Sequence, residues 1–99
     1  MATISRHIIV KASPDKADQI ERLWKQDCAP LMIKRPGCLR EELLRCREDP
    51  GEYISVSEWE SQEAIDNYLQ SEEHKQIVAH TRGLTGMAAT VKTYELVGG

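Results

Sequence analysis

Two turn sequences constrain the fold of this chain most strongly, namely Pro36-Gly37 and Glu48-Asp49-Pro50-Gly51. Proline and glycine in these combinations interrupt regular structure and reverse the direction of the backbone. Residues 38–47 lie between the two turns and are predicted to form a strand, because the second turn then makes a hairpin with residues 53–60. By helix propensity alone, Glu41-Glu42-Leu43-Leu44 is also compatible with a helix.

Capping residues and periodicity define the remaining elements. Residues 3–12 carry β-branched side chains typical of a strand, and Ser13-Pro14 then predicts the start of a helix capped by the Ser13 side chain. Ser61 and Ser71 predict the starts of two shorter helices, the second ending at Gly83, before a final strand over residues 87–97. Apolar residues recur at three- and four-residue steps in the first helix, which indicates a buried stripe of Ala17, Ile20, Trp24, Cys28 and Leu31.

The predicted order is β-α-β-β-α-β, which gives an α+β chain with the ferredoxin-like arrangement. We expect a four-stranded antiparallel sheet with both helical regions on one face. Strand alternation groups Arg6 with Ile4, Ile8 and Val10 on the helix side, and it places His7 on the opposite side. Apolar residues occur on both sides of the predicted sheet. A second copy of the chain could cover the open side, so the pattern predicts a homodimer through the sheet face.

Composition limits the classes of function. With 99 residues the chain makes a single domain, residues 1–99, and its formal net charge of −3 opposes a nucleic-acid partner. No apolar run is long enough to span a membrane, and no secretory signal is visible. Three cysteines without a paired spacing are typical of reduced thiols, so we expect a cytoplasmic protein.

Several short motifs together carry a family resemblance over nearly the whole chain. In this order and spacing they resemble the antibiotic biosynthesis monooxygenase family. The resemblance implies a dimeric α+β barrel, made when two sheets pack face to face, with a pocket between the sheet and helices of each subunit. Members include oxygenases that oxidise phenolic polycyclic or quinol-type molecules without metal or flavin, and relatives that degrade haem, isomerise substrates or bind small molecules. The motifs are Pro36-Gly37-Cys38-Leu39, Leu43-Leu44-Arg45, Glu48-Asp49-Pro50, Glu58-Trp59-Glu60-Ser61, Ala64, Leu69 and His74.

The sequence departs from the haem-degrading branch of these relatives. At the matching positions it carries His7 in place of Asn, Tyr68 in place of Trp, and Val78 in place of the iron-binding His. No HxxxH or paired-cysteine spacing joins the histidines and cysteines into another metal site. We therefore expect neither a metal nor another cofactor.

His74 and Tyr68 are the candidate catalytic residues. An imidazole with an ordinary pKa of about 6.5 can accept the proton of a phenol, and the resulting electron-rich anion can pass an electron to dioxygen. A tyrosine hydroxyl can hydrogen-bond a substrate oxygen but, with a pKa of about 10, is a poor base at neutral pH. The structural alternatives are a histidine on the rim of its helix beside Glu72 and Glu73, and a tyrosine ring packed at the edge of the core beside Leu69.

A second group of residues could bind the substrate. The Trp59 indole could stack on an aromatic ring, or it could simply fill the core. Arg6 could hold an anionic substrate group, or it could pair with Glu41 or Glu42. Ile8, Ile77 and Val78 would provide apolar contacts.

The function predicted from these features is a cofactor-independent monooxygenase that oxidises a quinol or polycyclic phenol, a small aromatic substrate. The alternatives are an isomerase, or a dimer of the same fold that binds a small molecule without catalysis.

Overall fold

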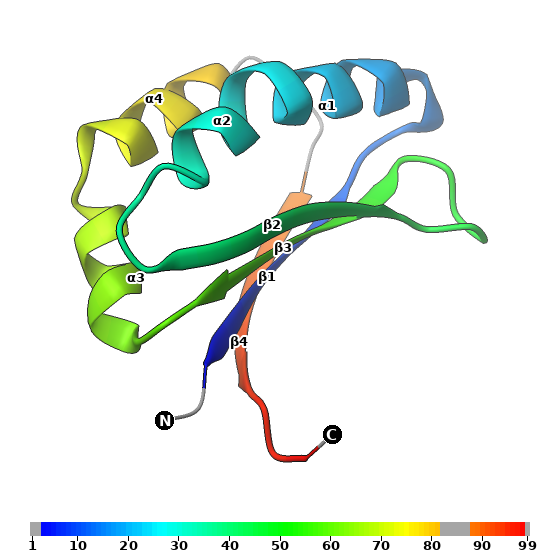
Figure 1. Ribbon diagram of the computed structural model, residues 1–99. Helices are drawn as coiled ribbons and strands as arrows, with labels where there is room; N and C mark the ends of the chain where they lie inside the picture. Colours follow the sequence, from blue (N-terminus) through cyan, green and yellow to red (C-terminus); the bar gives the residue numbers. More distant parts are fainter. Residues whose placement is uncertain (1–2, 82–87, 99) are drawn as a thin grey trace.

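The computed structural model of the protein describes residues 3–81 and 88–98 (Figure 1). A four-stranded antiparallel sheet has the strand order β2-β3-β1-β4, and the helices lie against one face of it. This arrangement confirms the α+β, ferredoxin-like fold. The elements are β1 (Ile4–Lys11), η1 (Pro14–Lys16), α1 (Ala17–Leu23), η2 (Trp24–Cys28), α2 (Ala29–Met32), β2 (Cys38–Arg45), β3 (Glu52–Trp59), α3 (Gln62–Leu69), α4 (Glu72–Thr81) and β4 (Ala88–Glu95).

The first helical region is continuous but changes its winding. A 3-10 turn leads into α1, and η2 is a stretch of wider π-helix in which the Ala29 N–H bonds to the Trp24 carbonyl. Pro30 explains the change, because proline has no N–H and its ring crowds the carbonyl of the preceding turn. The prediction that the Ser13 side chain caps this helix is wrong, since the Ser13 hydroxyl makes no capping hydrogen bond.

The two shorter helices begin as predicted. The Ser61 hydroxyl accepts a hydrogen bond of 3.1 Å from the Ala64 N–H, and the Ser71 hydroxyl accepts one of 3.2 Å from the His74 N–H. Such caps satisfy backbone donors that have no partner within the helix. Gly83, the predicted end of the second helix, lies outside the described residues.

The two turns also form where the sequence places them. Gly37 has a φ of 85°, and a β-carbon at this position would lie 2.5 Å from the Ala64 side chain. Glycine therefore allows both the turn and the close approach of α3. The strand after this turn is shorter than predicted, ending at Arg45 instead of 47, and it contains an irregularity between Cys38 and Arg40.

The irregularity is a β-bulge that changes which side chains of β2 face the helices. Cys38 pairs with Trp59, which faces the helices, whereas Arg40 pairs with Glu58 on the other face. From there alternation places Glu41 and Leu43 under the helices. Without the bulge, these two residues would point to the open side of the sheet.

The core lies where α2 and α3 meet the end of β3. Met32, Trp59, Ile65 and Tyr68 are each at most 3% exposed and form one cluster. Burial of such large side chains is the main stabilising contribution in a domain of this size. The prediction that Tyr53 and Trp59 lie opposite Ile54 and Val56 on β3 is confirmed by the register of the sheet.

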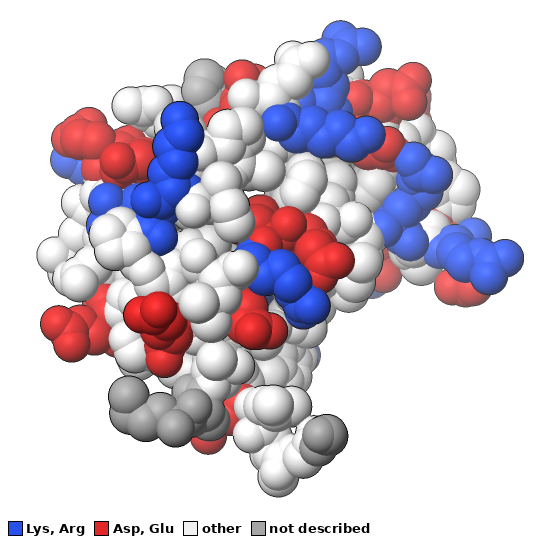
Figure 2. Space-filling view, viewed as in Figure 1, with Lys and Arg blue, Asp and Glu red and all other residues white. Residues whose placement is uncertain are grey.

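The surface is mixed in charge. Basic and acidic side chains alternate over the face shown in Figure 2, in keeping with the formal net charge of −3. No described helix is long and apolar enough to cross a membrane.

Candidate active site

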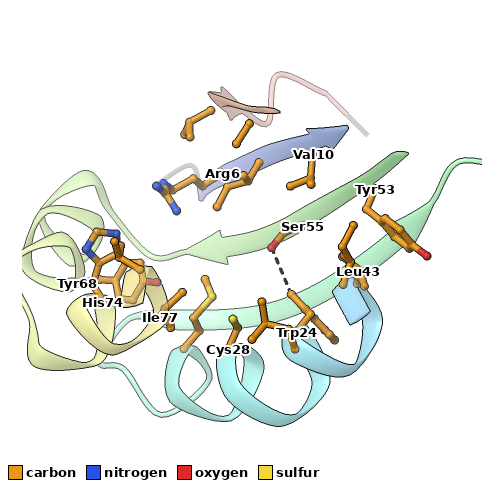
Figure 3. A pocket seen from close by; sticks show the side chains of 17 residues that line it. Arg6, Val10, Trp24, Cys28, Leu43, Tyr53, Ser55, Tyr68, His74 and Ile77 are labelled. Carbon is orange, nitrogen blue, oxygen red and sulfur yellow. Dashed lines mark hydrogen bonds between the residues drawn. The ribbon is translucent and has the colours of Figure 1, made fainter. Parts of the chain in front are cut away.

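A cavity of about 260 Å³ lies between the inner face of the sheet, meaning the face under the helices, and the helices themselves (Figure 3). The strands contribute Arg6, Ile8 and Ser55 to its wall, and the first helical region contributes Trp24 and Cys28. Val91 of β4 also lines the cavity and is 51% exposed, so the cavity opens to solvent along that edge of the sheet.

The structure brings together most of the residues singled out in the sequence. Arg6 and Ile8 reach the cavity from β1, and Tyr68 reaches it from the end of α3. His74, Ile77 and Val78 reach it from α4. Segments more than 60 residues apart in sequence therefore meet in one cavity with a largely apolar wall. In Figure 3 the side chains of Arg6, His74 and Tyr68 lie at the same end of the cavity.

Trp59 does not line this cavity. Its indole is fully buried, and its Nε1 donates a hydrogen bond of 2.9 Å to the Ser57 hydroxyl. The ring lies 5.1 Å from the ring of Tyr68, at an angle of 32°. This packing makes Trp59 a support for Tyr68 and not a residue that contacts a ligand.

Tyr68 offers a hydrogen-bond donor to the cavity. Its hydroxyl bonds to no other described residue, although the side chain is only 1% exposed. Burial raises the pKa of the hydroxyl far above its ordinary value, so the phenol stays protonated. A neutral hydroxyl of this kind is suited to donate to a ligand oxygen.

His74 stands at the first turn of α4, with its ring edge against Tyr68 at 5.1 Å between centroids. Burial and the neighbouring Arg6 charge lower the pKa of His74, while a hydrogen bond to the backbone of Leu69 partly opposes this decrease. The imidazole is therefore neutral at neutral pH. A neutral imidazole can accept a hydrogen bond or a proton.

Arg6 is a buried cation, 8% exposed, without an ion-pair partner among the described carboxylates. Burial lowers the pKa of Arg6, and the nearby Tyr68 and Glu41 oppose the shift. Glu42, one of the two partners considered in the sequence, pairs with Arg40 at 3.0 Å on the opposite face. A guanidinium remains charged in proteins, so Arg6 can bind an anionic group in the cavity.

Glu41 is a functional candidate that the sequence pattern indicated only as a partner for Arg6. Its Oε1 accepts hydrogen bonds from the Ser55 hydroxyl at 2.8 Å and from Trp24 Nε1 at 2.9 Å. Burial raises the pKa of this carboxyl to about 7. The sequence signal was a glutamate in a strand beside apolar residues, but only the bulge in β2 shows that it faces the helices.

The comparisons with known proteins agree with this fold and identify a family. A family model described as antibiotic biosynthesis monooxygenase matches residues 3–80, most of the chain. The chain belongs to this family. Membership supports a general monooxygenase-like role, whereas the fold alone would be compatible with many activities.

Solved structures show the same fold. A candidate antibiotic biosynthesis monooxygenase from Bordetella bronchiseptica superimposes with a TM-score of 0.85 at 21% identity, covering 98% of this chain and 99% of that one. A second candidate monooxygenase, from Caulobacter crescentus, gives a TM-score of 0.81 at 22% identity, covering 98% of this chain and 92% of that one. A conserved protein from Methanosarcina mazei gives 0.82 at 19% identity, with 95% and 92% covered. No curated protein matches the sequence.

Within the part of this monooxygenase-family chain that the structure describes, no three histidine, cysteine or acidic side chains come close enough to hold a metal ion. The polar groups of the cavity include a guanidinium, a phenol, an imidazole and a serine hydroxyl. Together these groups can bind an oxygen anion and accept a proton.

Proposed function

We propose that this family member is a cofactor-independent monooxygenase that oxidises a quinol or other phenolic small molecule in the cavity. The observation that carries the proposal is the convergence of Arg6, Tyr68 and His74 at one end of a largely apolar cavity. His74 would assist removal of the hydroxyl proton, while Arg6 and the Tyr68 hydroxyl would stabilise the oxygen anion. The electron-rich phenolate would then react with dioxygen directly.

The cavity also supports a size class for the substrate. A protein cavity of about 150 Å³ holds one benzene molecule. At about 260 Å³ this cavity has space for a substituted ring or a bicyclic compound. Ile8, Ile77 and Val78 would contact the faces of such a ring, which is a role typical of apolar residues in small-molecule sites.

We also propose that the protein is a homodimer joined through the outer face of the sheet, meaning the face without helices. The outer face carries Ile9, Ile54 and Leu44, and the half-exposed Tyr94 packs against His7 with 4.7 Å between ring centroids. Exposed apolar residues on a sheet favour burial by a second copy.

The cysteines bear on the cellular compartment. The free state of Cys28, Cys38 and Cys46 supports a reducing compartment, the cytoplasm.

An aerobic screen of hydroquinones, anthrones and catechols tests the function, with oxygen consumption and product mass recorded together. For an active substrate we expect that His74→Ala lowers turnover about a hundredfold or more, the usual contribution of acid–base catalysis. Lys75→Ala is the matched control, since Lys75 lies on the same helix and its side chain pairs with Glu72 at the surface.

The same screen separates the alternatives. Turnover that persists without oxygen would indicate an isomerase. Tight binding without turnover would indicate a non-catalytic binding protein. Unchanged turnover in His74→Ala would exclude the role given to His74.

A further inference from the structure

A buried carboxyl group lies directly behind the cavity wall. Ser55 and Trp24 both line the cavity, and both donate hydrogen bonds to Glu41 Oε1, at 2.8 and 2.9 Å. Figure 3 shows the two donors facing one another, and Trp24 Nε1 also lies 3.4 Å from the Ser55 hydroxyl oxygen. Both side chains connect the cavity to Glu41, and of the two only the Ser55 hydroxyl can accept a proton as well as donate one.

The second oxygen of this carboxyl group has no such support. Glu41 Oε2 is buried and has no hydrogen-bond partner among the described residues. Burial removes a carboxylate from water, and hydrogen bonds from several donors normally offset the free-energy cost. With one oxygen unpartnered, the hydrogen bonds to Glu41 offset only part of this cost. Burial accordingly raises the pKa of Glu41 to about 7, even though Ser55 and Trp24 oppose the shift. Near neutral pH this group gains or loses a proton easily.

Few charges surround Glu41 at neutral pH. Arg6 on β1 favours its ionised form, and Glu42 on β2 disfavours it. Tyr68 on α3 and Cys28 on η2 also face the carboxyl group, but burial raises the pKa of both, in the case of Cys28 to about 11. Burial likewise raises the pKa of the Cys38 thiol on β2. Arg6 is therefore the nearby cation that balances a negative charge, whether that charge is on Glu41 or on a ligand.

The two possible proton acceptors differ in what protonation does to the cavity. A proton on His74 creates a second, half-buried positive charge beside Arg6, and both burial and Arg6 lower the pKa of His74. A proton on Glu41 removes a buried negative charge instead. Arg6 and Glu41 lie in one row across the sheet, on either side of Ser57. When Glu41 is neutral, the positive charge of Arg6 is therefore available to a phenolate in the cavity.

We propose that Glu41 is the final acceptor of the proton from a phenol bound in the cavity, and that Ser55 transfers it. This inference rests on the proposed function. The phenol O–H bond breaks as its proton bonds to the Ser55 oxygen, and the proton of Ser55 moves to Glu41 Oε1. No electron is transferred. The negative charge passes from Glu41 to the phenolate beside Arg6. In this refinement of the proposed function Glu41, and not His74, retains the proton, and His74 assists only through a hydrogen bond to the substrate.

A proton count on ligand binding tests the proposal. The probe is 3-nitrophenol, whose anion absorbs visible light, added to the full chain just above neutral pH. The visible band measures how much bound phenol is ionised. Calorimetric titration in two buffers with different ionisation enthalpies measures how many protons reach the solvent. In the native protein we expect bound anion with almost no proton released, because Glu41 retains it.

Glu41→Gln is the decisive variant. The amide oxygen can still accept from Ser55 and Trp24, but the side chain can no longer take a proton. We expect this variant to release one proton to the buffer for each anion formed. Glu42→Gln is the matched control on the opposite face of the same strand, and it should behave like the native protein. Ser55→Ala should slow the appearance of the visible band at least tenfold after rapid mixing.

The outcomes separate this inference from the proposed function. If Glu41→Gln binds the anion without releasing a proton, the acceptor is another group and Glu41 is excluded. Glu41 is also excluded as the acceptor if the His74→Ala variant releases a proton to the buffer while the Glu41→Gln variant retains it. If the native protein fails to bind 3-nitrophenol, or binds it only in the neutral form, the proposed phenolate chemistry fails as well.

Discussion

Each face of the sheet carries some residues that are unusual for its side. The inner face, under the helices, carries Arg6, Glu41 and Ser55, all buried or half-buried. The outer face carries Leu44 and Ile54 in neighbouring positions on β2 and β3, and Leu44 is 50% exposed. In a simple two-layer protein the covered face would be apolar and the open face polar, as it is at the ion-paired Arg40, Glu42 and Glu58.

The difference indicates that each face serves a different purpose. Burying an arginine and a glutamate without a direct ion pair is unfavourable for folding, and such groups are typical of functional sites. Apolar side chains on the open face are unfavourable for an isolated subunit in water. We infer that the inner face is adapted to a ligand and the outer face to a second subunit. Three predictions test this comparison.

The largest effect is expected at the core beneath the cavity. Trp59→Ala removes the largest fully buried side chain of the inner face, so it should lower the free energy of unfolding by about 3–5 kcal/mol. Trp59→Phe keeps most of the volume and loses the hydrogen bond to Ser57, for which we expect a cost of about 1 kcal/mol or somewhat more. Urea denaturation measures both. Equal losses in the two variants would show that ring packing does not stabilise this face.

The second effect is a pH dependence caused by Glu41. Since burial raises the pKa of this group from 4.5 to about 7, the folded state binds its proton more tightly than the unfolded state. The corresponding stabilisation is fully present below pH 4.5 and is lost as the pH rises through about 7, which amounts to roughly 3 kcal/mol.

Glu41→Gln should remove this pH dependence, so the variant gains stability relative to the native protein as the pH rises across that window. Glu42→Gln, on the outer face, should leave the dependence in place. Denaturation curves at several pH values measure the difference. A native protein whose stability changes with pH in parallel with Glu41→Gln would contradict the burial of this carboxyl group.

The smallest effect is expected on the outer face. Leu44→Glu places a charge in the proposed dimer interface, where the two copies would bring such charges together. We expect the dissociation constant of the dimer to rise at least tenfold, equivalent to about 1.4 kcal/mol. Leu96→Glu, at a position 68% exposed beyond the end of β4, is the control. Sedimentation over a range of concentrations measures the change, and a native protein that stays monomeric would refute the proposed interface.

Much of the fold could be predicted because its signals are local. Proline and glycine set the turns at residues 36–37 and 48–51, and serines cap α3 and α4 through contacts only three residues away. Strand alternation also placed Arg6 and Ile8 on the helix side correctly, because β1 pairs without a bulge. The sequence by itself therefore determined the order of elements, the family and six of the seventeen residues that line the cavity.

Only the tertiary structure determined that Glu41 is buried behind the cavity wall and has a raised pKa. A single bulge between Cys38 and Arg40 reverses the direction of every later side chain in β2, and nothing in the local sequence marks its position. It places Glu41 beside Ser55 and Trp24, residues that are 14 and 17 positions away in the chain. Burial at this place changes the carboxyl pKa, and burial depends on contacts between distant segments that no local pattern contains. Likewise, the packing of α3 on β3 places Tyr68, and not Trp59, in the wall of the cavity.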